Sequence, residues 1–425
     1  MATGSFILNN YEIISTLESI FTLFYSLLHE VWILQTLAFV ILAGSIMALI
    51  EKSGGVGGFV AYALNKKAFV KSERSALMLS YILGVVIFIE TSITALVSGA
   101  VGKPLCDTYK IPHAKLAYVC DSTSAPIGSL IVLNGYGALL LGLISTQISQ
   151  GVLEGNATQI LISALKYNLY AIIALIVAFL FIYFSIDVGA MKQSVYKTHS
   201  TLKADSVAKS MYYMLLPIGL MVSLVFLFLY VSGDGNILRG NGSSSIFYTM
   251  LATLGFTFFY YIFTNNVSFS LWSKTAYKGA KSFIPISFIL VFAFGLGNVA
   301  SELKTGAYLA SLASQNVSPY FLASVVFILS SVISFSTGTS WGTFSIMVPV
   351  ATPMAVGMDA NIALVMGAVI SGGIFGDHCS PISDTTVISS MAADCEVVEH
   401  VKTQLPYALF SGLIAFILFV VFSFI

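Results

Sequence analysis

The chain has 425 residues, of which 57% are hydrophobic and only 9% are charged, and its mean hydropathy is +0.92. Soluble domains carry about 25% charged residues, so this composition excludes a soluble protein and indicates a polytopic membrane protein. The 19 basic and 19 acidic side chains cancel at pH 7, which argues against nucleic acid as a partner.

Apolar runs long enough to cross a membrane recur along the whole chain. A spanning helix needs roughly 20 mostly apolar residues. The sequence predicts spans at about 12–29, 31–50, 76–90, 158–185, 211–231, 246–263, 281–300, 319–335 and 404–424. Together with two irregular segments, they predict an all-α polytopic membrane protein with about 10–12 transmembrane helices.

The two irregular segments, 91–147 and 336–395, are apolar overall but are interrupted by Gly, Pro, Ser and Thr. Each is predicted to form a re-entrant hairpin followed by a helix that is broken in its middle. Irregular backbone at membrane depth persists only where it lines a cavity or is buried in protein. A binding site for a cation or a small polar solute is therefore expected in these segments.

Short phrases of the first half recur in the same order in the second half. The pairs are Lys52-Ser53-Gly54 with Lys304-Thr305-Gly306, Thr91-Ser92 with Thr339-Ser340, and the phrase at 121–126 with that at 377–381. Paired interrupted segments in two halves indicate the central site of a secondary transporter. This pattern predicts an N-terminal helix at 1–30, transport repeats at 31–185 and 281–425, and connecting helices with a polar loop at 186–280.

The distribution of basic residues indicates that the two repeats are inverted. The loop after the first repeat's second helix carries Lys66, Lys67, Lys71 and Arg74, whereas its counterpart after residue 300 carries only Lys304. Cytoplasmic loops collect Lys and Arg, so the two loops are expected on opposite faces. The predicted spans place an even number of crossings between equivalent helices. Inversion needs an odd number, so one crossing between 127 and 231 is expected to be miscounted.

Asp377 and Asp384 flank the interruption of the second irregular segment, near Gly376 and Pro381. A carboxylate near the bilayer centre costs at least ~2.5–3.5 kcal/mol, so two of them predict a functional site. Each could bind Na⁺ through its oxygens or take up a proton. The alternative is that either carboxylate caps the N-terminus of a half-helix.

Further oxygen donors are expected around these two carboxylates. The predicted ion and substrate ligands are Asp377, Asp384, Asp121, Ser380, Ser383, Thr385, Thr386, Ser122, Thr123, Ser124, Thr339 and Ser340. Within this set, Na⁺ is assigned to Asp377, Asp384 and Asp121. These three, with Ser380, are predicted to share one buried polar site near the middle of the membrane.

Other polar residues near the interruptions allow two interpretations each. Glu90 is either a proton carrier that faces the cavity or an interfacial residue at a helix end. His378 could titrate near neutral pH, or it could only hydrogen-bond the acids. Trp341 either packs the second hairpin or lines the solute pocket. The charged residues after the broken helix are predicted to form a solvated interfacial face, namely Asp394, Glu396, Glu399 and His400.

Sequence signals of catalysis are missing. Neither Ser380 nor Ser383 has the flanking residues of a nucleophile elbow, and the chain has no phosphate-binding Gly-Lys motif. The sequence therefore predicts neither an enzyme nor an ATP-driven pump, and no organic cofactor.

Three phrases resemble the NhaC family of Na⁺/H⁺ antiporters within the ion transporter superfamily: GTSWGTF at 338–344, GDHCSPISDTTVISS at 376–390 and HVKTQLPYAL at 400–409. The similarity is closest over about 281–410. It implies inverted repeats, scaffold and transport parts, an elevator-like alternation, and a homodimer in the inner (cytoplasmic) membrane of the cell. Because the chain is short for this branch, one or two N-terminal helices of the family pattern are expected to be absent.

The resemblance leaves two transport functions open. Relatives are assigned to Na⁺/H⁺ exchange, to Na⁺-coupled malate–lactate exchange or to amino acid uptake. The first function is exchange of Na⁺ for H⁺, with both cations competing for Asp377 and Asp384. The alternative is Na⁺-coupled transport of a small organic acid or amino acid. A channel is disfavoured because the doubled broken helices indicate alternating access. The expected partners are membrane lipids, a second copy of the chain and the transported solute.

Overall fold

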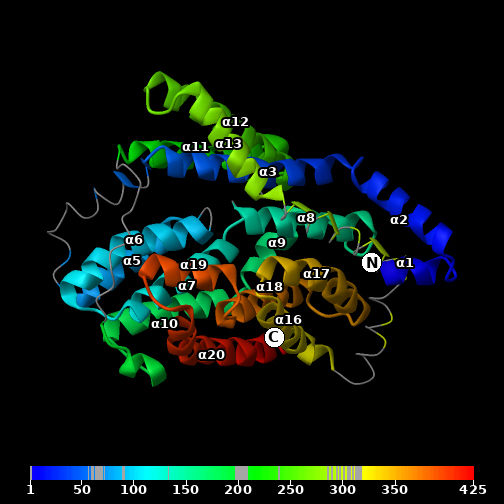
Figure 1. Ribbon diagram of the computed structural model, residues 1–425. Helices are drawn as coiled ribbons and strands as arrows, with labels where there is room; N and C mark the ends of the chain where they lie inside the picture. Colours follow the sequence, from blue (N-terminus) through cyan, green and yellow to red (C-terminus); the bar gives the residue numbers. More distant parts are fainter. Residues whose placement is uncertain are drawn as a thin grey trace.

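The fold is given by a computed structural model of the chain (Figure 1). The structure describes residues 2–55, 57–58, 62, 70, 72–88, 91–132, 134–196, 209–237, 240–284, 287–288, 291–292, 295, 298–299, 302–303, 308, 311 and 318–425. Within these ranges the chain forms helices and no strand. The all-α prediction is confirmed, since a helix satisfies its own backbone hydrogen bonds in lipid.

The helices differ widely in length. Those of the first half are α1 (Ala2–Leu8), α2 (Ile13–Leu27), α3 (Val31–Lys52), α5 (Glu73–Val86), α6 (Thr91–Tyr109), α7 (His113–Ser129), α8 (Gly135–Ser149), α9 (Ala157–Leu165) and α10 (Leu169–Phe184). Those that follow are η2 (Gly189–Gln193), α11 (Tyr212–Ser232), α12 (Gly242–Phe263), α13 (Phe269–Ser282), α16 (Pro319–Thr337), α17 (Ser340–Gly357), α18 (Ile362–Cys379), α19 (Asp384–Ala393) and α20 (Val397–Phe422). Seven of the described helices are long and apolar enough to cross a membrane, which makes this a multi-pass membrane protein.

The helices form two groups, which Figure 1 shows one above the other. The upper group contains α3, α11, α12 and α13, and the lower group contains α5–α7, α10 and α16–α20. Helix α8 lies between the groups and contacts α3 and α12 on one side and α17 on the other. In the upper group, Gly44 and Gly279 let α3 and α13 approach closely. A Cβ added at Gly44 would lie 2.5 Å from the Gly279 carbonyl oxygen.

The lower group contains a helical hairpin made by α16 and α17. Its turn is at Gly338, whose φ of +67° favours glycine, and the Thr339 hydroxyl caps α17 by accepting from Gly342 N at 3.4 Å. Helix α18 packs closely against α16, because Gly376 leaves room for the Ser331 carbonyl group. This hairpin and α18 position the interruption that follows Cys379.

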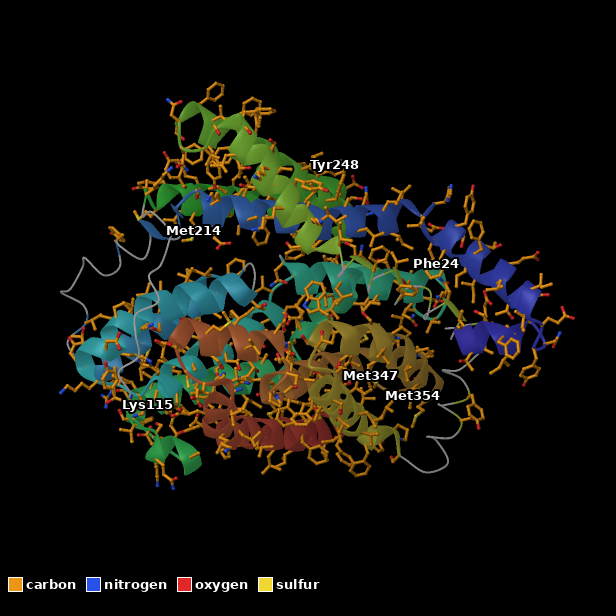
Figure 2. The ribbon with its side chains drawn as sticks, viewed as in Figure 1. Phe24, Lys115, Met214, Tyr248, Met347 and Met354 are labelled. Carbon is orange, nitrogen blue, oxygen red and sulfur yellow. The ribbon has the colours of Figure 1, made fainter. Side chains whose placement is uncertain are left out.

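Ion pairs join several helix ends at one end of the lower group. The ammonium group of Lys115 contacts Glu73 at 2.8 Å and Asp187 at 2.9 Å, and Lys103 contacts Asp394 at 2.7 Å. Figure 2 shows Lys115 at this end, whereas Met347 and Met354 lie toward the opposite end. The starts of α5 and α7 and the ends of α10 and α19 therefore share one side of the molecule.

The structure corrects two predicted helix boundaries in the first half. Helix α7 runs unbroken through the predicted interruption at 121–126 with Pro126 inside it, and the chain leaves the helix only between Ser129 and Gly135. Proline keeps a helical φ and removes only one donor, while Asn134 caps the following helix by accepting from Gly137 N at 3.2 Å. The predicted span at 158–185 is two helices, α9 and α10, which are separated before Asn168.

The two predicted hairpins also differ from the structure in their arms. Helix α16, predicted as a separate span, is the first arm of the second hairpin. In the first half, α6 is a single helix that follows α5, so 91–147 holds only one arm of a hairpin. The predicted span at 281–300, the Lys304 phrase and Lys66, Lys67 and Lys71 lie largely or wholly outside the described residues.

Candidate functional site

The interruption between α18 and α19 follows from local sequence. Pro381 has no N–H group to donate, and a proline biases the residue before it toward an extended conformation. Accordingly Ser380, which precedes Pro381, has φ −82° and ψ 127°, and α18 ends at Cys379. The Ser380 hydroxyl donates to the Phe335 carbonyl oxygen at 2.8 Å, which ties the interruption to the hairpin.

Asp377 lies in the last turn of α18, and its side chain is buried, with 1% of its surface exposed. Its two carboxylate oxygens accept from the Ser383 hydroxyl at 2.9 Å and the Thr385 hydroxyl at 3.3 Å. These two hydroxyl oxygens lie 3.0 Å apart. No Lys, Arg or His of the described residues forms an ion pair with Asp377. The result is a buried carboxylate with neutral hydroxyl neighbours.

Asp384 stands in a different setting from Asp377. It begins α19, is exposed, and accepts a hydrogen bond from Thr385 N at 2.9 Å. A carboxylate in this position satisfies a free N–H group of the first turn and stabilises the helix dipole. The prediction that Asp384 shares the buried site is therefore wrong, because the interruption turns its side chain outward.

Asp121 is fully buried in the middle of α7, where four side chains donate to its carboxylate. The shortest bonds come from Gln404 Nε2 at 2.9 Å and His400 Nε2 at 3.1 Å. The hydroxyls of Thr386 and Ser389 lie at 3.4 and 3.5 Å. Asp121 is thus surrounded by donors from α19 and α20.

His378 links the region of Asp377 to that of Asp121. It follows Asp377 in α18, and its ring faces Asp121 and Ser122 of α7. Its Nε2 lies 3.8 Å from Asp121 Oδ2 and 3.3 Å from the Ser122 hydroxyl, and its Nδ1 lies 2.6 Å from the Tyr170 hydroxyl. Helix α19 makes a second connection, because Thr385 bonds Asp377 and the next residue, Thr386, bonds Asp121. The structure thus brings Asp377, Asp121 and Ser380 into one buried polar region.

Several predicted ligands lie outside this region or have other partners. The Thr123 hydroxyl donates to Val119 O within α7, and the Ser124 hydroxyl donates to Asp121 O. Thr339 caps α17, and the Ser340 hydroxyl lies 2.9 Å from the Tyr136 hydroxyl of α8. Glu90 lies outside the described residues.

Trp341 packs against the first half of the chain. Its ring centroid lies 5.4 Å from that of Tyr136, and its edge fills the space beside Gly135. Of the two roles expected for this tryptophan, the contacts match packing between the second hairpin and α8.

His400 and Gln404 are functional candidates that the sequence interpretation missed. The prediction of a solvated face is wrong for His400, which is fully buried because the first turns of α20 pack against α7 and α19. Asp394 of the same predicted face forms an ion pair with Lys103. The spacing of four residues between His400 and Gln404 places both on one helix face. Two polar residues on one face of a largely apolar helix were the available signal.

The donors around Asp377 suit a hard cation. Among the residues that the structure describes, no group of three or more His, Cys, Asp or Glu side chains is arranged to hold a metal ion. Carboxylate, hydroxyl and carbonyl oxygens are instead the ligands that hard cations prefer. Asp377, Ser383 and Thr385 present such oxygens within hydrogen-bonding distance of one another.

Comparison with known proteins identifies a family that this chain matches in sequence and a solved structure that shares its fold. The model of the Na⁺/H⁺ antiporter family matches residues 134–424. An uncharacterised protein of Haemophilus influenzae is 33% identical over 390 residues, which cover 87% of this chain and 75% of that protein. The malate-2H⁺/Na⁺-lactate antiporter of Bacillus subtilis is 35% identical over 108 residues, which cover 25% of this chain and 23% of that protein.

A solved structure confirms the type of fold. The YdaH transporter of Alcanivorax borkumensis superposes with a TM-score of 0.64 at 13% identity, over 96% of this chain and 88% of that one. The matched family and this neighbour are transporters, in agreement with the expectation that the chain is not an enzyme.

Proposed function

This chain belongs to the Na⁺/H⁺ antiporter family, and we propose that it is a secondary active transporter that exchanges Na⁺ for H⁺ by alternating access. The observation that carries the proposal is Asp377. Its carboxylate is buried, and the structure gives it hydroxyl partners but no basic partner among the described residues.

The exchange follows from the cost of an unpaired charge in a membrane protein. A bare buried carboxylate is costly, whereas the same group is tolerated when it is protonated or paired with a cation. Asp377 can hold Na⁺ or a proton, but not both at once. The loaded forms therefore cross the membrane and the empty, charged form does not, which couples the two fluxes.

We assign Na⁺ to the oxygens of Asp377, Ser383 and Thr385. Asp121 is left out of this set because its oxygens already accept from the amide of Gln404 and the ring of His400. The exposed Asp384 stands beside the site as the first residue of α19. Na⁺ and H⁺ are thus the transported ions.

Alternating access is proposed to occur between the two helix groups. In this elevator-like scheme, α3 and α11–α13 form the scaffold, and the lower group moves with Asp377 along α8. In each half, two successive helices (α5 and α6, α16 and α17) are followed by a third helix, an interruption and a fourth helix, which supports two repeats at 31–185 and 281–425. We propose that the two repeats are inverted. The segments 1–30 and 186–280 complete the domain scheme.

The orientation and assembly are part of the same proposal. Basic residues gather at the end of the lower group marked by Lys115, including Arg74, Lys103, Lys192 and Lys402. Cytoplasmic segments collect Lys and Arg, so we place this end in the cytoplasm. We further propose a homodimer in the inner (cytoplasmic) membrane of the cell.

Na⁺-coupled transport of a small organic acid or amino acid is the second candidate function. The observation that favours it is the start of α19 beside Asp377, because N–H groups at a helix N-terminus attract carboxylates. The name of the Bacillus subtilis relative also joins Na⁺ to two organic anions. In this mode Na⁺ and the solute would cross together.

The first test replaces the proposed Na⁺ ligand with its neutral isostere. Asp377→Asn should lower Na⁺ uptake into proteoliposomes by about 100-fold or more, since it removes the charged partner of Na⁺ at a buried site, where the loss of one partner of an ion pair costs ~3–5 kcal/mol. The variant should unfold at the same or a higher temperature than the natural protein, because it buries no charge. Asp359→Asn is the control, since Asp359 is exposed and its φ of +53° suits asparagine. Uptake by Asp377→Asn at the rate of the control would contradict the assignment.

A further inference from the structure

Helix α13 carries three exposed lysines on one face. Lys274, Lys278 and Lys281 follow one another at intervals of four and three residues, which places them on the same side of a helix. Ala276 and Gly279 are buried on the opposite side, against α3. The helix contains no acidic residue, so it concentrates positive charge in a chain whose net charge is zero. The lysine face is therefore turned away from the rest of the protein.

The three lysines have no charged partner within the described part of the chain. The lysine ion pairs found there involve Lys103 and Lys115, which belong to the lower group. Among the described helices, α13 packs mainly against α3 and touches α12, and neither contact covers the lysine face. A charged side chain that faces hydrocarbon is costly. The three ammonium groups therefore need water or a negatively charged partner in the membrane environment.

The start of α13 lies where several helices of the upper group end. Asn266, in the turn before α13, donates to the carbonyl oxygen of Ser53 after α3 at 3.1 Å. The carbonyl oxygen of Asn266 accepts from Lys209 Nζ, just before α11, at 2.8 Å. Figure 2 shows Met214 of α11 toward the same end as Lys115. Helix α13 thus starts at the end of the molecule that we place at the cytoplasmic surface of the membrane.

Helix geometry leads the lysine side chains back toward that surface. The Cα–Cβ bonds of an α-helix tilt toward its N-terminus, and long lysine stems carry the ammonium group to the headgroups while their methylenes cover apolar surface. Tyr277 and Phe269 of the same helix are 71% and 64% exposed, and aromatic side chains of this kind are enriched at membrane–water interfaces. With only 14 residues, α13 is also too short to cross the bilayer.

We propose that the lysine face of α13 binds the headgroups of anionic phospholipids. Lipid phosphate oxygens accept charge-assisted hydrogen bonds from ammonium groups, and basic residues near a membrane surface attract anionic lipids. At the nearby end of α3, Glu51 and Lys52 are both exposed and their charges cancel. The positive excess at this end of the upper group therefore comes from α13. The bound lipids would anchor this group while the lower group moves.

A second copy of the chain fits this face less well than a phospholipid does. A two-fold axis through an interface brings identical surfaces together, so the lysines of one protomer would face the lysines of its partner. Helix α13 has no acidic residue that could relieve this repulsion. Charge complementarity therefore favours the anionic lipid.

The experiment measures thermal unfolding of the full chain in a neutral detergent, with added phosphatidylglycerol or phosphatidylcholine of the same acyl chains. Phosphatidylglycerol should raise the unfolding midpoint more than phosphatidylcholine does, because it binds the folded protein, and salt should weaken the effect. Replacing Lys274, Lys278 and Lys281 together with Gln should demand about 100-fold more phosphatidylglycerol for the same rise, at about fivefold per lysine. Equal effects of the two lipids on the natural protein would overturn the proposal.

A matched control removes three other exposed lysines. Lys110, Lys166 and Lys192 lie on separate parts of the chain, and their combined replacement with Gln should leave the response to phosphatidylglycerol unchanged. An unchanged response in the α13 variant, or an equal loss in the control, would contradict a lipid site on α13. None of these outcomes depends on Na⁺/H⁺ exchange.

Two further measurements identify the occupant of the lysine face. Inorganic phosphate should not raise the midpoint, and a rise equal to that with phosphatidylglycerol would overturn the lipid as the ligand. The mass of the protein in solution should be the same for the α13 variant as for the natural chain. Conversion of a dimer to a monomer by the α13 variant alone would assign this face to a second copy and overturn the proposal.

Discussion

The two buried carboxylates, Asp377 and Asp121, differ in their neighbours, and this difference assigns their proposed roles. In the described part of the chain, Asp377 accepts from the hydroxyls of Ser383 and Thr385, whose oxygens could also ligate a cation. Asp121 accepts from two hydroxyls and also from an amide and an imidazole, whose donating N–H groups have no lone pair to offer Na⁺. Asp377 is therefore the carboxylate that we propose for Na⁺.

Asp384, the exposed carboxylate beside the site, provides a test of the assignment of Na⁺ to Asp377. Asp384→Asn removes the charge from the start of α19, which should cost about 0.3–1 kcal/mol of stability through the helix dipole. We expect the Na⁺ concentration for half-maximal uptake to stay within a factor of two. A loss of uptake as large as that of Asp377→Asn would return Asp384 to the cation site.

The sequence identified the buried carboxylates and the hydroxyl partners of Asp377, but not the amide and imidazole partners of Asp121. The cost of charge in lipid predicted Asp377 and Asp121 as functional residues, and both are buried. The same rule failed for Asp384, because the turn at Pro381 directs its side chain outward. It also failed for His400, whose neighbours come from distant parts of the chain and depend on how α20 packs. Local sequence contains no information on such contacts.

At the level of elements, the crossing of α16 and α18 positions Asp377. Glycines of α18 allow this crossing: a Cβ at Gly376 would lie 2.2 Å from Ser331 O, and one at Gly372 would lie 2.4 Å from Phe327 O. The Ser334 hydroxyl donates across the crossing to Gly373 O at 2.6 Å. Small residues with short polar links are typical of close helix pairs in membranes.

Gly376→Ala should disrupt this crossing. The new methyl group would meet backbone, which has no rotamer to escape to, so we expect a loss of about 1–3 kcal/mol of stability. A lower midpoint of thermal unfolding in detergent would show this loss. Gly255→Ala in α12 is the matched control, because a Cβ there meets nothing within 4 Å. That control should unfold at an equal or higher temperature, since Ala favours a helix over Gly. Equal midpoints for the two variants would contradict the proposed role of Gly376.

Most long helices were predictable from apolar length, but the interruptions were not. Spans near α3, α11, α12 and α16 were predicted within a few residues, whereas α20 begins seven residues before its predicted span at 404–424. The interruption after α7 lies later in the chain than predicted, because Pro126 does not break the helix. In the structure, Asn168 holds this region by donating to Ser129 Oγ at 2.8 Å. Such a long-range bond determines the boundary, and a single sequence does not show it.

At the level of the whole molecule, the buried polar region lies within the lower helix group alone, which supports our proposal that this group moves relative to the upper one. The site residues all belong to the lower group, on α7, α18, α19 and α20 (Figure 1). The upper group contributes none of the described site residues. Motion of the lower group along α8 would therefore carry the whole site, with Asp377 and Asp121 keeping their relative positions.

The most direct measurement of Na⁺/H⁺ exchange is luminal pH in proteoliposomes when Na⁺ is added outside without any organic solute. We expect the luminal pH to rise as Na⁺ enters and protons leave, and to stay constant in vesicles with Asp377→Asn. A constant pH with the natural protein, together with Na⁺-driven accumulation of a labelled organic acid, would contradict exchange and support solute transport.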